Sequence, residues 1–408
     1  MRICILASVF WPIYPGQGGR HAFVLAETLA EMGHQIDVIS THPINFDEKK
    51  SDLKLISFEF KDGIRIIRIP SFRTTRPSLF RKFIFYLSFS LTSLLALPFI
   101  SSDIILGLHP PPPYLIFNSF LISKLKRSKY ILRVTDFWPD VLFDYSYFRW
   151  NVLKTIVTVV SRIMYNLADY ILAFTPMLKS MLIGFGISEH KIGTLEMATD
   201  TDVFRSIPDI RNESGKLGLP DLNSKFVVFY SGAFALTYDF NLLLNAAKLL
   251  ESEKEILFVL LGDGDSKDHI MGMIKKLSIR NVLLIPPVSG ADSVSKYINC
   301  SDVCVVPLKA EMSTSMNTRP SKIFEFWACE KPVIAACEGS LAKFIDESEA
   351  GIVVEPGNFN EFADVIYNCY KNPGKTKLLG TSGRKLVLQR FSYPVLKDNL
   401  KEIIYNII

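Results

Sequence analysis

The chain has 408 residues, with 46 Lys and Arg against 41 Asp and Glu, a formal net charge of +5 and 49% hydrophobic residues. This composition excludes a disordered chain, and the length suits two domains of about 200 residues better than one. The six cysteines stand among apolar residues without CxxC spacing, which excludes a zinc site and a disulfide framework and favours reduced core thiols of a cytoplasmic protein.

The first elements read as strand, loop, helix and strand. Arg2–Phe10 is apolar and suits a buried parallel strand, and a loop rich in Gly and Pro follows it. Apolar spacing predicts a helix over 20–32, closed by Gly33 as a left-handed cap. Gly18 and Gly19 come just before this helix. They either form an ordinary tight connection or let an acceptor or a phosphate approach the backbone closely.

Bases dominate the next part of the chain. Between Gly63 and Thr135 there is one acid, Asp103, against eleven Lys and Arg residues. The residues from Phe83 to Ile100 carry no charge, a length that borders on membrane-spanning. Their serines and proline, and the strand that follows at once, favour a buried or interfacial helix instead. The basic region is either a solvated face or a surface for anionic lipid or a phosphorylated acceptor.

Apolar runs that read as strands recur along the chain, with helical stretches between several of them. They cover residues 64–69, 104–108, 130–134, 170–174, 226–230, 256–261, 282–285, 303–306 and 332–335. A polar stretch rich in Gly and Pro, 201–225, is expected to connect the two halves. The alternation predicts an α/β fold of two doubly wound domains with parallel sheets, which bind ligands at the carboxyl ends of their strands.

The segment 318–328, TRPSKIFEFWA, is the most informative part of the sequence. Pro320 favours a helix start, so Ser321, Lys322 and free backbone amides would lie at the positive end of that helix, a natural diphosphate site. Glu325 lies one turn further on and faces much as Lys322 does, so its carboxylate can accept two hydrogen bonds from a ribose diol. The alternative is a surface helix that carries a Lys/Glu pair.

The longer segment PSKIFEFWACEKPVIAA, which starts at Pro320, resembles the donor-site helix of the retaining GT-B glycosyltransferases of family 4, in the branch that builds bacterial surface polysaccharides. Other motifs resemble the family in the right order across nearly the whole chain. They are the GQGG loop, RVTDFWPD from Arg133, EMATDTDVF from Glu196, YSG from Tyr230 and GDG from Gly262.

The resemblance implies a GT-B fold, in which two doubly wound Rossmann-like domains face each other across a cleft. The acceptor-binding domain would span 1–204 and the donor-binding domain 205–389, with a C-terminal helix, about 390–408, packed back on the first. The implied reaction moves a sugar from a nucleotide-sugar donor, expected to be a UDP-sugar, to a polyprenyl-diphosphate-linked saccharide in O-antigen, capsule or exopolysaccharide synthesis. We expect no cofactor, no metal and no nucleic-acid partner. The expected location is cytoplasmic, in peripheral contact with anionic lipid at the inner face of the cell membrane.

The family's donor-site roles carry over to matching positions. Glu325 matches the second acid of the paired-glutamate motif and would hold the donor ribose. The first acid of that motif falls at Asn317, a departure that leaves only neutral hydrogen bonds to the transferred sugar. Arg319 and Lys322 would neutralise the diphosphate leaving group. The remaining expected donor contacts are Ser321, Gly232, Gly262 and Gly264.

The acceptor side is expected to lie at the ends of strands in the first domain. Asp136 resembles the position where relatives carry a residue near the acceptor hydroxyl, which it would orient or deprotonate, unless it is a structural turn residue. Trp138 would shape the pocket beside it. His109 ends another strand and is either an acceptor contact or structural, and Gly18 and Gly19 complete the expected acceptor contacts.

Two departures, Asn317 and the loop after the first strand of the donor domain, keep a non-catalytic function open. Typical members place an Arg and a Lys in the loop after the first strand of the donor domain, and here Gly232–Tyr238 contains neither. A non-catalytic nucleotide-sugar-binding subunit that supports a partner transferase is therefore one alternative. A nucleotide-sugar 2-epimerase is another, although such an enzyme needs no lipid acceptor.

Overall fold

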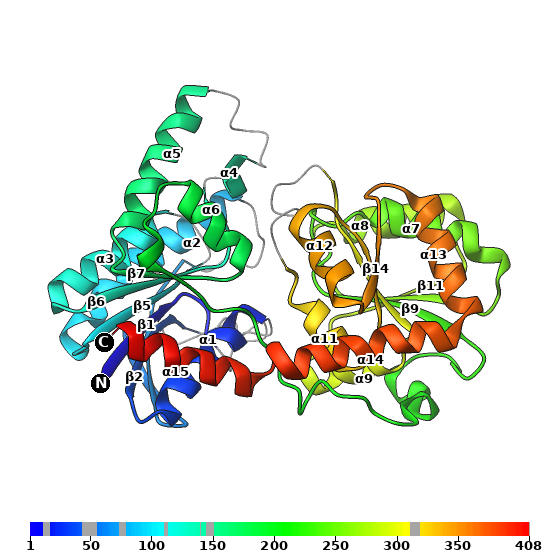
Figure 1. The fold of residues 1–408 in the computed structure, drawn as a ribbon, viewed down its shortest axis with the longest axis horizontal. Helices are drawn as coiled ribbons and strands as arrows, with labels where there is room; N and C mark the ends of the chain where they lie inside the picture. The colour runs from blue at the N-terminus through cyan, green and yellow to red at the C-terminus, as the bar shows by residue number, and fades with distance from the viewer. Residues whose placement is uncertain are drawn as a thin grey trace. The chain divides into compact units, whose positions relative to one another are not determined.

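The computed structural model describes residues 1–10, 17–42, 55–72, 79–109, 113–138, 140–143, 151–310 and 319–407. The chain divides into two compact units (Figure 1). Unit 1 comprises Met1–Glu196 together with Lys397–Ile408, and unit 2 comprises Met197–Leu396. Each unit has its own sheet and its own hydrophobic core.

Unit 1 is built on an eight-stranded sheet in the order β3-β4-β2-β1-β5-β6-β7-β8. Neighbouring strands are parallel except β3 and β4, which are antiparallel. The strands are β1 (Arg2–Ala7), β2 (Gln35–Thr41), β3 (Ser57–Lys61), β4 (Ile64–Ile69), β5 (Ile104–His109), β6 (Lys129–Val134), β7 (Tyr170–Ala173) and β8 (Ile192–Thr194). The helices are α1 (Gln17–Glu31), α2 (Leu79–Thr92), α3 (Pro113–Lys126), α4 (Asp140–Phe143), α5 (Asn151–Asn166) and α6 (Pro176–Gly184), with short 3₁₀ helices η1 (Ser93–Phe99) and η2 (Glu189–Lys191).

The uncharged run from Phe83 to Ile100 lies on one face of this sheet. It forms α2 and then η1, and Phe89 at its centre is fully buried in the core of unit 1. The α-helix gives way to 3₁₀ geometry after Thr92, whose hydroxyl donates to the carbonyls of Ser88 and Pro70. Among the described helices, none has the length and apolar character needed to span a membrane.

Unit 2 contains a six-stranded sheet, parallel throughout, in the order β11-β10-β9-β12-β13-β14. The strands are β9 (Phe226–Ser231), β10 (Ile256–Leu261), β11 (Val282–Ile285), β12 (Val303–Pro307), β13 (Val333–Ala336) and β14 (Gly351–Val354). The helices are α7 (Phe240–Leu249), α8 (Lys267–Leu277), α9 (Ala291–Asn299), α11 (Lys322–Ala328), α12 (Gly339–Ser348), α13 (Phe359–Lys371) and α14 (Pro373–Arg390), with η3 (Ile210–Leu217) and η4 (Leu250–Ser252). The last helix, α15 (Tyr393–Ile407), begins in unit 2 and ends in unit 1.

Both faces of the second sheet are covered. Val227 and Phe229 of β9 point into one core, whereas Val228 and Tyr230 point into another on the opposite face. A strand buried on both faces is expected to be almost continuously apolar, and β9 reads FVVFYS with its one serine at the end. The predicted α/β class with two doubly wound domains is therefore confirmed.

The segment 201–225, which we expected to connect the domains, packs instead as part of unit 2. Ile210, Leu219 and Leu222 are buried in its core, and Arg211 donates to Asp302 at 2.5 Å. These apolar residues are widely spaced between polar ones, so the stretch has no helical or strand period that would reveal its burial.

Three short strands were not predicted, namely β3, β8 and β14. β3 lies at the edge of its sheet, and its Phe58 and Phe60 are exposed. β8 and β14 also lie at sheet edges and have three and four residues. Pairing with a neighbouring strand, which local pattern does not reveal, defines such edges.

Helix α11, which contains most of the segment 318–328, packs against α14. Trp327 of α11 is fully buried, and its indole N–H donates to the Ala350 carbonyl at 2.9 Å. A Cβ atom added at Gly380 would lie 2.0 Å from the Glu330 carbonyl oxygen, and one added at Gly383 would lie 2.5 Å from the Trp327 ring. The two helices therefore approach each other as closely as only glycine allows.

This contact predicts opposite effects for two glycines of α14. Gly380→Ala should lower the free energy of unfolding by about 1–3 kcal/mol, because the new methyl group meets backbone that cannot move aside. Gly374→Ala, where a Cβ meets nothing within 4 Å, should be neutral or stabilising by about 0.5–1 kcal/mol. Urea unfolding of the two variants measures both. Equal effects would contradict the close packing of α11 on α14.

Candidate functional site

Two glycine loops of unit 2 lie side by side at the carboxyl ends of β9 and β10. Gly232 follows β9, and Gly262 and Gly264 follow β10, its parallel neighbour. The Phe234 amide donates to the Asp263 carbonyl at 2.8 Å, which ties the loops together. A Cβ atom at Gly262 would lie 2.0 Å from the Gly232 carbonyl oxygen, and one at Gly264 would lie 2.8 Å from the Phe234 backbone. Gly262 and Gly264 are therefore required for packing, because any side chain there would overlap the neighbouring backbone.

Lys322, the first residue of α11, reaches into this arrangement. Its Nζ atom lies 4.1 Å from the ring centroid of Tyr230 and 4.0 Å from that of Tyr238. A Cβ atom added at Gly232 would lie 2.9 Å from Nζ, so the ammonium contacts the first glycine loop directly. Lys322 is buried, and its Nζ has no hydrogen-bond partner in the described part of the chain.

The electrostatics of this lysine are unusual. Burial lowers the pKa of Lys322 to about 7, although the nearby Glu325 carboxylate acts in the opposite direction. The two aromatic faces attract the cation but accept no conventional hydrogen bond from it. Burying a charge without a full set of partners costs several kcal/mol, and an anionic ligand would remove much of that cost. The arrangement can therefore bind an anion between the glycine loops and α11.

The other predicted donor residues lie around α11. Ser321 occupies the N-cap position, but its hydroxyl makes no capping hydrogen bond. Glu325 is partly exposed one turn after Lys322 and interacts with it electrostatically. The Arg319 guanidinium stacks 3.8 Å from the ring centroid of Phe344. Asn317 lies outside the described residues.

In unit 1, Asp136 follows β6 in a largely apolar environment. Burial raises the pKa of Asp136, although the Thr135 hydroxyl donates to its carboxylate at 2.9 Å. Its charge in turn contributes to the raised pKa values of Tyr86 on α2 and Tyr165 on α5. A carboxylate whose pKa is raised in this way is suited to accept a proton.

Trp138 is buried beside Asp136. Its amide donates to the Tyr165 hydroxyl at 3.0 Å, while its indole Nε1 has no hydrogen-bond partner within the described ranges. His109 ends β5 and is aligned with Val134 of β6, so it shares the carboxyl edge of the sheet with Asp136. Gly18 and Gly19 lie in the first turn of α1, next to residues 11–16, which are outside the described part.

Two features of these sites were not foreseen from the sequence. The first is the pair of rings, Tyr230 and Tyr238, that enclose Lys322. The second is Arg133, which is buried on β6 with its guanidinium 5.6 Å from the ring centroid of Phe174. Its Nε lacks a hydrogen-bond acceptor among the described residues, and burial lowers the pKa of Arg133 to about 10. The sequence feature that could have indicated this burial is the single base within the apolar strand YILRV.

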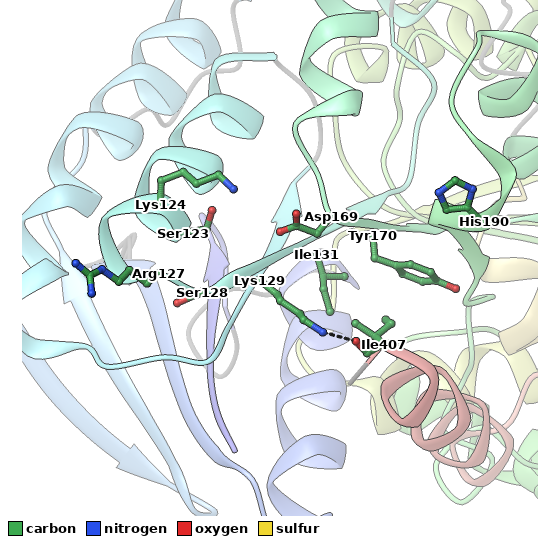
Figure 2. Close-up of a pocket in the computed structure, with 10 residues that line it drawn as sticks. All are labelled: Ser123, Lys124, Arg127, Ser128, Lys129, Ile131, Asp169, Tyr170, His190 and Ile407. Atoms are coloured by element: carbon green, nitrogen blue, oxygen red, sulfur yellow. Dashed lines mark hydrogen bonds between the residues drawn. The ribbon is translucent and has the colours of Figure 1, made fainter.

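A shallow depression of about 510 Å³ lies elsewhere in unit 1 (Figure 2). Its lining includes Lys124, Arg127 and His190, and Lys129 donates to the Ile407 carbonyl at 2.7 Å across it. It opens at the amino end of β6, opposite the end that leads to Asp136. The described lining residues include none of the predicted site residues. Separately, His, Cys, Asp and Glu side chains within the described ranges form no group of three that would hold a metal ion.

Sequence comparison with family models assigns both halves of the chain. The model described as "Glycosyltransferase Family 4" matches residues 18–203, and the model described as "Glycosyl transferases group 1" matches residues 225–372. The chain belongs to glycosyltransferase family 4. The family resemblance seen in the motifs is therefore confirmed, and it places the chain among sugar-transferring enzymes.

Curated relatives match at low identity. The chitobiosyldiphosphodolichol beta-mannosyltransferase of Debaryomyces hansenii is 23% identical over 306 residues, which are 65% of this chain and 59% of that protein. The capsular polysaccharide biosynthesis glycosyltransferase CapM of Staphylococcus aureus is 25% identical over 244 residues, 59% of this chain and 62% of that protein. The chain thus spans less than two thirds of the length of these relatives.

Solved structures match the family-4 chain over nearly its whole length. Sucrose-phosphate synthase from Thermosynechococcus elongatus has a TM-score of 0.78 at 18% identity, covering 99% of this chain and 98% of that one. Anabaena HepE in complex with UDP has a TM-score of 0.70 at 17% identity, covering 99% and 100%. At such identities the likeness shows the fold alone, and it confirms the predicted GT-B fold.

The unpaired ammonium makes a stability prediction. Replacing Lys322 by Met removes a buried charge and keeps a long unbranched side chain. The free energy of unfolding of the ligand-free variant should therefore rise by about 1–4 kcal/mol at pH 6. Because the pKa of the folded state, about 7, lies below the ordinary 10.5, the charge penalty is complete below pH 7 and fades as the pH rises toward 10.5.

The gain should therefore be larger at pH 6 than at pH 9, as measured by thermal unfolding at both values. Lys343→Met, at a position whose side chain is 77% exposed, is the matched control and should change little. A Lys322→Met variant that is less stable at pH 6 would contradict the unpaired ammonium.

Proposed function

We propose that this chain transfers a sugar from a nucleoside-diphosphate donor, a UDP-sugar, to a lipid-linked saccharide during the synthesis of a surface polysaccharide. The observation that carries the proposal is the buried Lys322 ammonium, enclosed by Tyr230 and Tyr238 against Gly232. A diphosphate supplies the anion that this cation lacks, and it becomes more negative as the bond to the sugar breaks.

Similar proteins support the choice of donor and acceptor. Anabaena HepE, which shares the fold, has been crystallised with UDP and with UDP-glucose. CapM is named for capsular polysaccharide biosynthesis, and the Debaryomyces relative is named for a saccharide linked to dolichol through a diphosphate. A polyprenyl-diphosphate-linked acceptor would place the chain in the cytoplasm, in peripheral contact with anionic lipid at the inner face of the cell membrane.

The proposed reaction assigns the two units different tasks. In unit 2, Glu325 holds the ribose, while Arg319 and Lys322 neutralise the nucleoside diphosphate as the bond between its distal phosphate oxygen and the sugar breaks. In unit 1, Asp136 takes the proton of the acceptor hydroxyl as that oxygen bonds to the sugar. We propose retention of the anomeric configuration on the basis of the family resemblance, so the acceptor oxygen bonds to the sugar on the same face from which the diphosphate departs.

A second candidate is a nucleotide-sugar-binding subunit without its own activity. It is favoured by one observation, the absence of Arg and Lys from the loop Gly232–Tyr238, which leaves fewer cations for the leaving group. Turnover of a UDP-sugar and a lipid-linked acceptor by the purified chain alone separates the two candidates. Formation of a 2-epimer without acceptor would instead indicate a nucleotide-sugar epimerase.

The donor site is tested by thermal stabilisation with UDP, GDP and CMP in the presence of EDTA. UDP should give a saturable upward shift, and Glu325→Ala should weaken UDP about 10- to 100-fold, because charge-assisted hydrogen bonds are worth about 1.5–3 kcal/mol. Glu347→Ala, at a position whose side chain is 64% exposed, is the matched control. Unchanged UDP affinity in Glu325→Ala would remove Glu325 from the ribose site.

The catalytic role of Asp136 is tested by Asp136→Asn. The variant should lose about 10²- to 10⁴-fold in kcat while UDP affinity is preserved, since the amide cannot accept the hydroxyl proton. Because burial raises the pKa of Asp136, the acid limb of the kcat profile should lie above the ordinary range of an aspartate and should disappear in the variant. Wild-type turnover by Asp136→Asn would exclude proton transfer to this carboxylate.

A further inference from the structure

Helix α5 exposes the face that its sequence would be expected to bury. Val152, Ile156, Val159 and Ile163, spaced by four, three and four residues, form one stripe and are 73%, 52%, 51% and 53% exposed. The polar Ser161 is buried on the opposite side. The first turns of α5 extend beyond the other labelled helices of unit 1 (Figure 1). An apolar stripe left exposed at this spacing is typical of an interaction surface.

The neighbouring helices continue this surface. Exposed apolar residues recur at every fourth position along α2 and η1, at Phe83, Leu87, Leu91, Leu95 and Phe99. On α3, Phe117 and Leu125 are also exposed. Since α3 packs against both α2 and α5, the three helices form one layer over one face of the sheet. We call the outer side of this layer the apolar face.

The charge of this layer has one sign. The sequences of α2, η1, α3 and α5 contain neither Asp nor Glu, whereas Arg81, Lys124, Lys126, Lys154 and Arg162 lie on them. Within the basic region, Arg65 and Arg68 pair with acids and Arg133 is buried. Apolar side chains combined with bases alone fit an anionic lipid surface.

We propose that the apolar face of α2, η1, α3 and α5 docks unit 1 onto an anionic lipid bilayer, with the α5 stripe inserted at the headgroup boundary. No described helix is suited to span a membrane, so the contact is interfacial. A second copy of the chain is a poorer occupant, because a two-fold contact would bring the bases of one copy against those of the other.

The docking face and the candidate acceptor site share the same helices. The Asp136 carboxylate contributes to the raised pKa values of Tyr86 on α2 and Tyr165 on α5, so both helices lie near it. The outer sides of the same helices carry the exposed apolar residues. The saccharide of a lipid-linked acceptor could therefore reach Asp136 while its lipid remains in the membrane. This consequence rests on the proposed function, whereas the docking itself does not.

The test is co-sedimentation of the purified chain with vesicles of phosphatidylcholine alone and of phosphatidylcholine with about 30% phosphatidylglycerol. The wild type should partition at least tenfold more onto the anionic vesicles, and added salt should weaken that binding. The double variant Ile156→Asp/Ile163→Asp should lose at least tenfold in partition. Lys124→Gln/Lys126→Gln should reduce the preference for anionic lipid. Leu378→Asp, at an apolar position of α14 that is 67% exposed, is the matched control and should bind as the wild type does.

Stabilisation by UDP, measured on every variant, keeps docking and donor binding separate and shows that the variants are folded. Wild-type protein that binds UDP but stays in the supernatant with both vesicles overturns the docking inference and the proposed membrane contact, and leaves the proposed sugar transfer standing. Equal vesicle binding by the stripe variant overturns it as well. So does a stripe variant that changes from dimer to monomer with no loss of vesicle binding, because the face would then be an interface between copies.

Discussion

The buried ammonium of Lys322 is the interaction on which the candidate donor site depends. It contacts Gly232, lies against the rings of Tyr230 and Tyr238, and is at the start of α11. Each neighbour removes water from the cation without supplying an acceptor for its protons. The glycine loops contact one another at backbone distance, and α14 packs closely against α11. The site is therefore preorganised for an anion.

In unit 1 the corresponding constraint is the double use of α2 and α5. Their inner sides bring Tyr86 and Tyr165 to Asp136, and burial of that carboxylate raises its pKa. Their outer sides carry apolar residues that a purely soluble protein would seldom leave exposed. The same layer of helices thus contributes both to the surroundings of Asp136 and to the exposed apolar face.

Much of the candidate donor site could be proposed from the sequence because its parts are local. A glycine loop after an apolar strand, and a helix that begins with Pro320, Ser321 and Lys322, are visible as patterns within a few residues. Arg133 shows the limit. It was counted as one base of a basic region, yet the structure buries it. Whether a charge inside a strand reaches solvent depends on which helix covers that face, and local sequence does not contain that information.

The sequence alone determined most of the strands and the family. β4, β10 and β11 begin and end at the expected residues, because short runs of large apolar residues mark all three, interrupted in β4 by Arg65 and Arg68. The tertiary structure alone decided the edge strands β3, β8 and β14, the burial of 201–225, the environment of Lys322 and the outward direction of the α5 stripe. An apolar period shows that a helix has two faces, but only packing against the rest of the chain determines which face is turned inward.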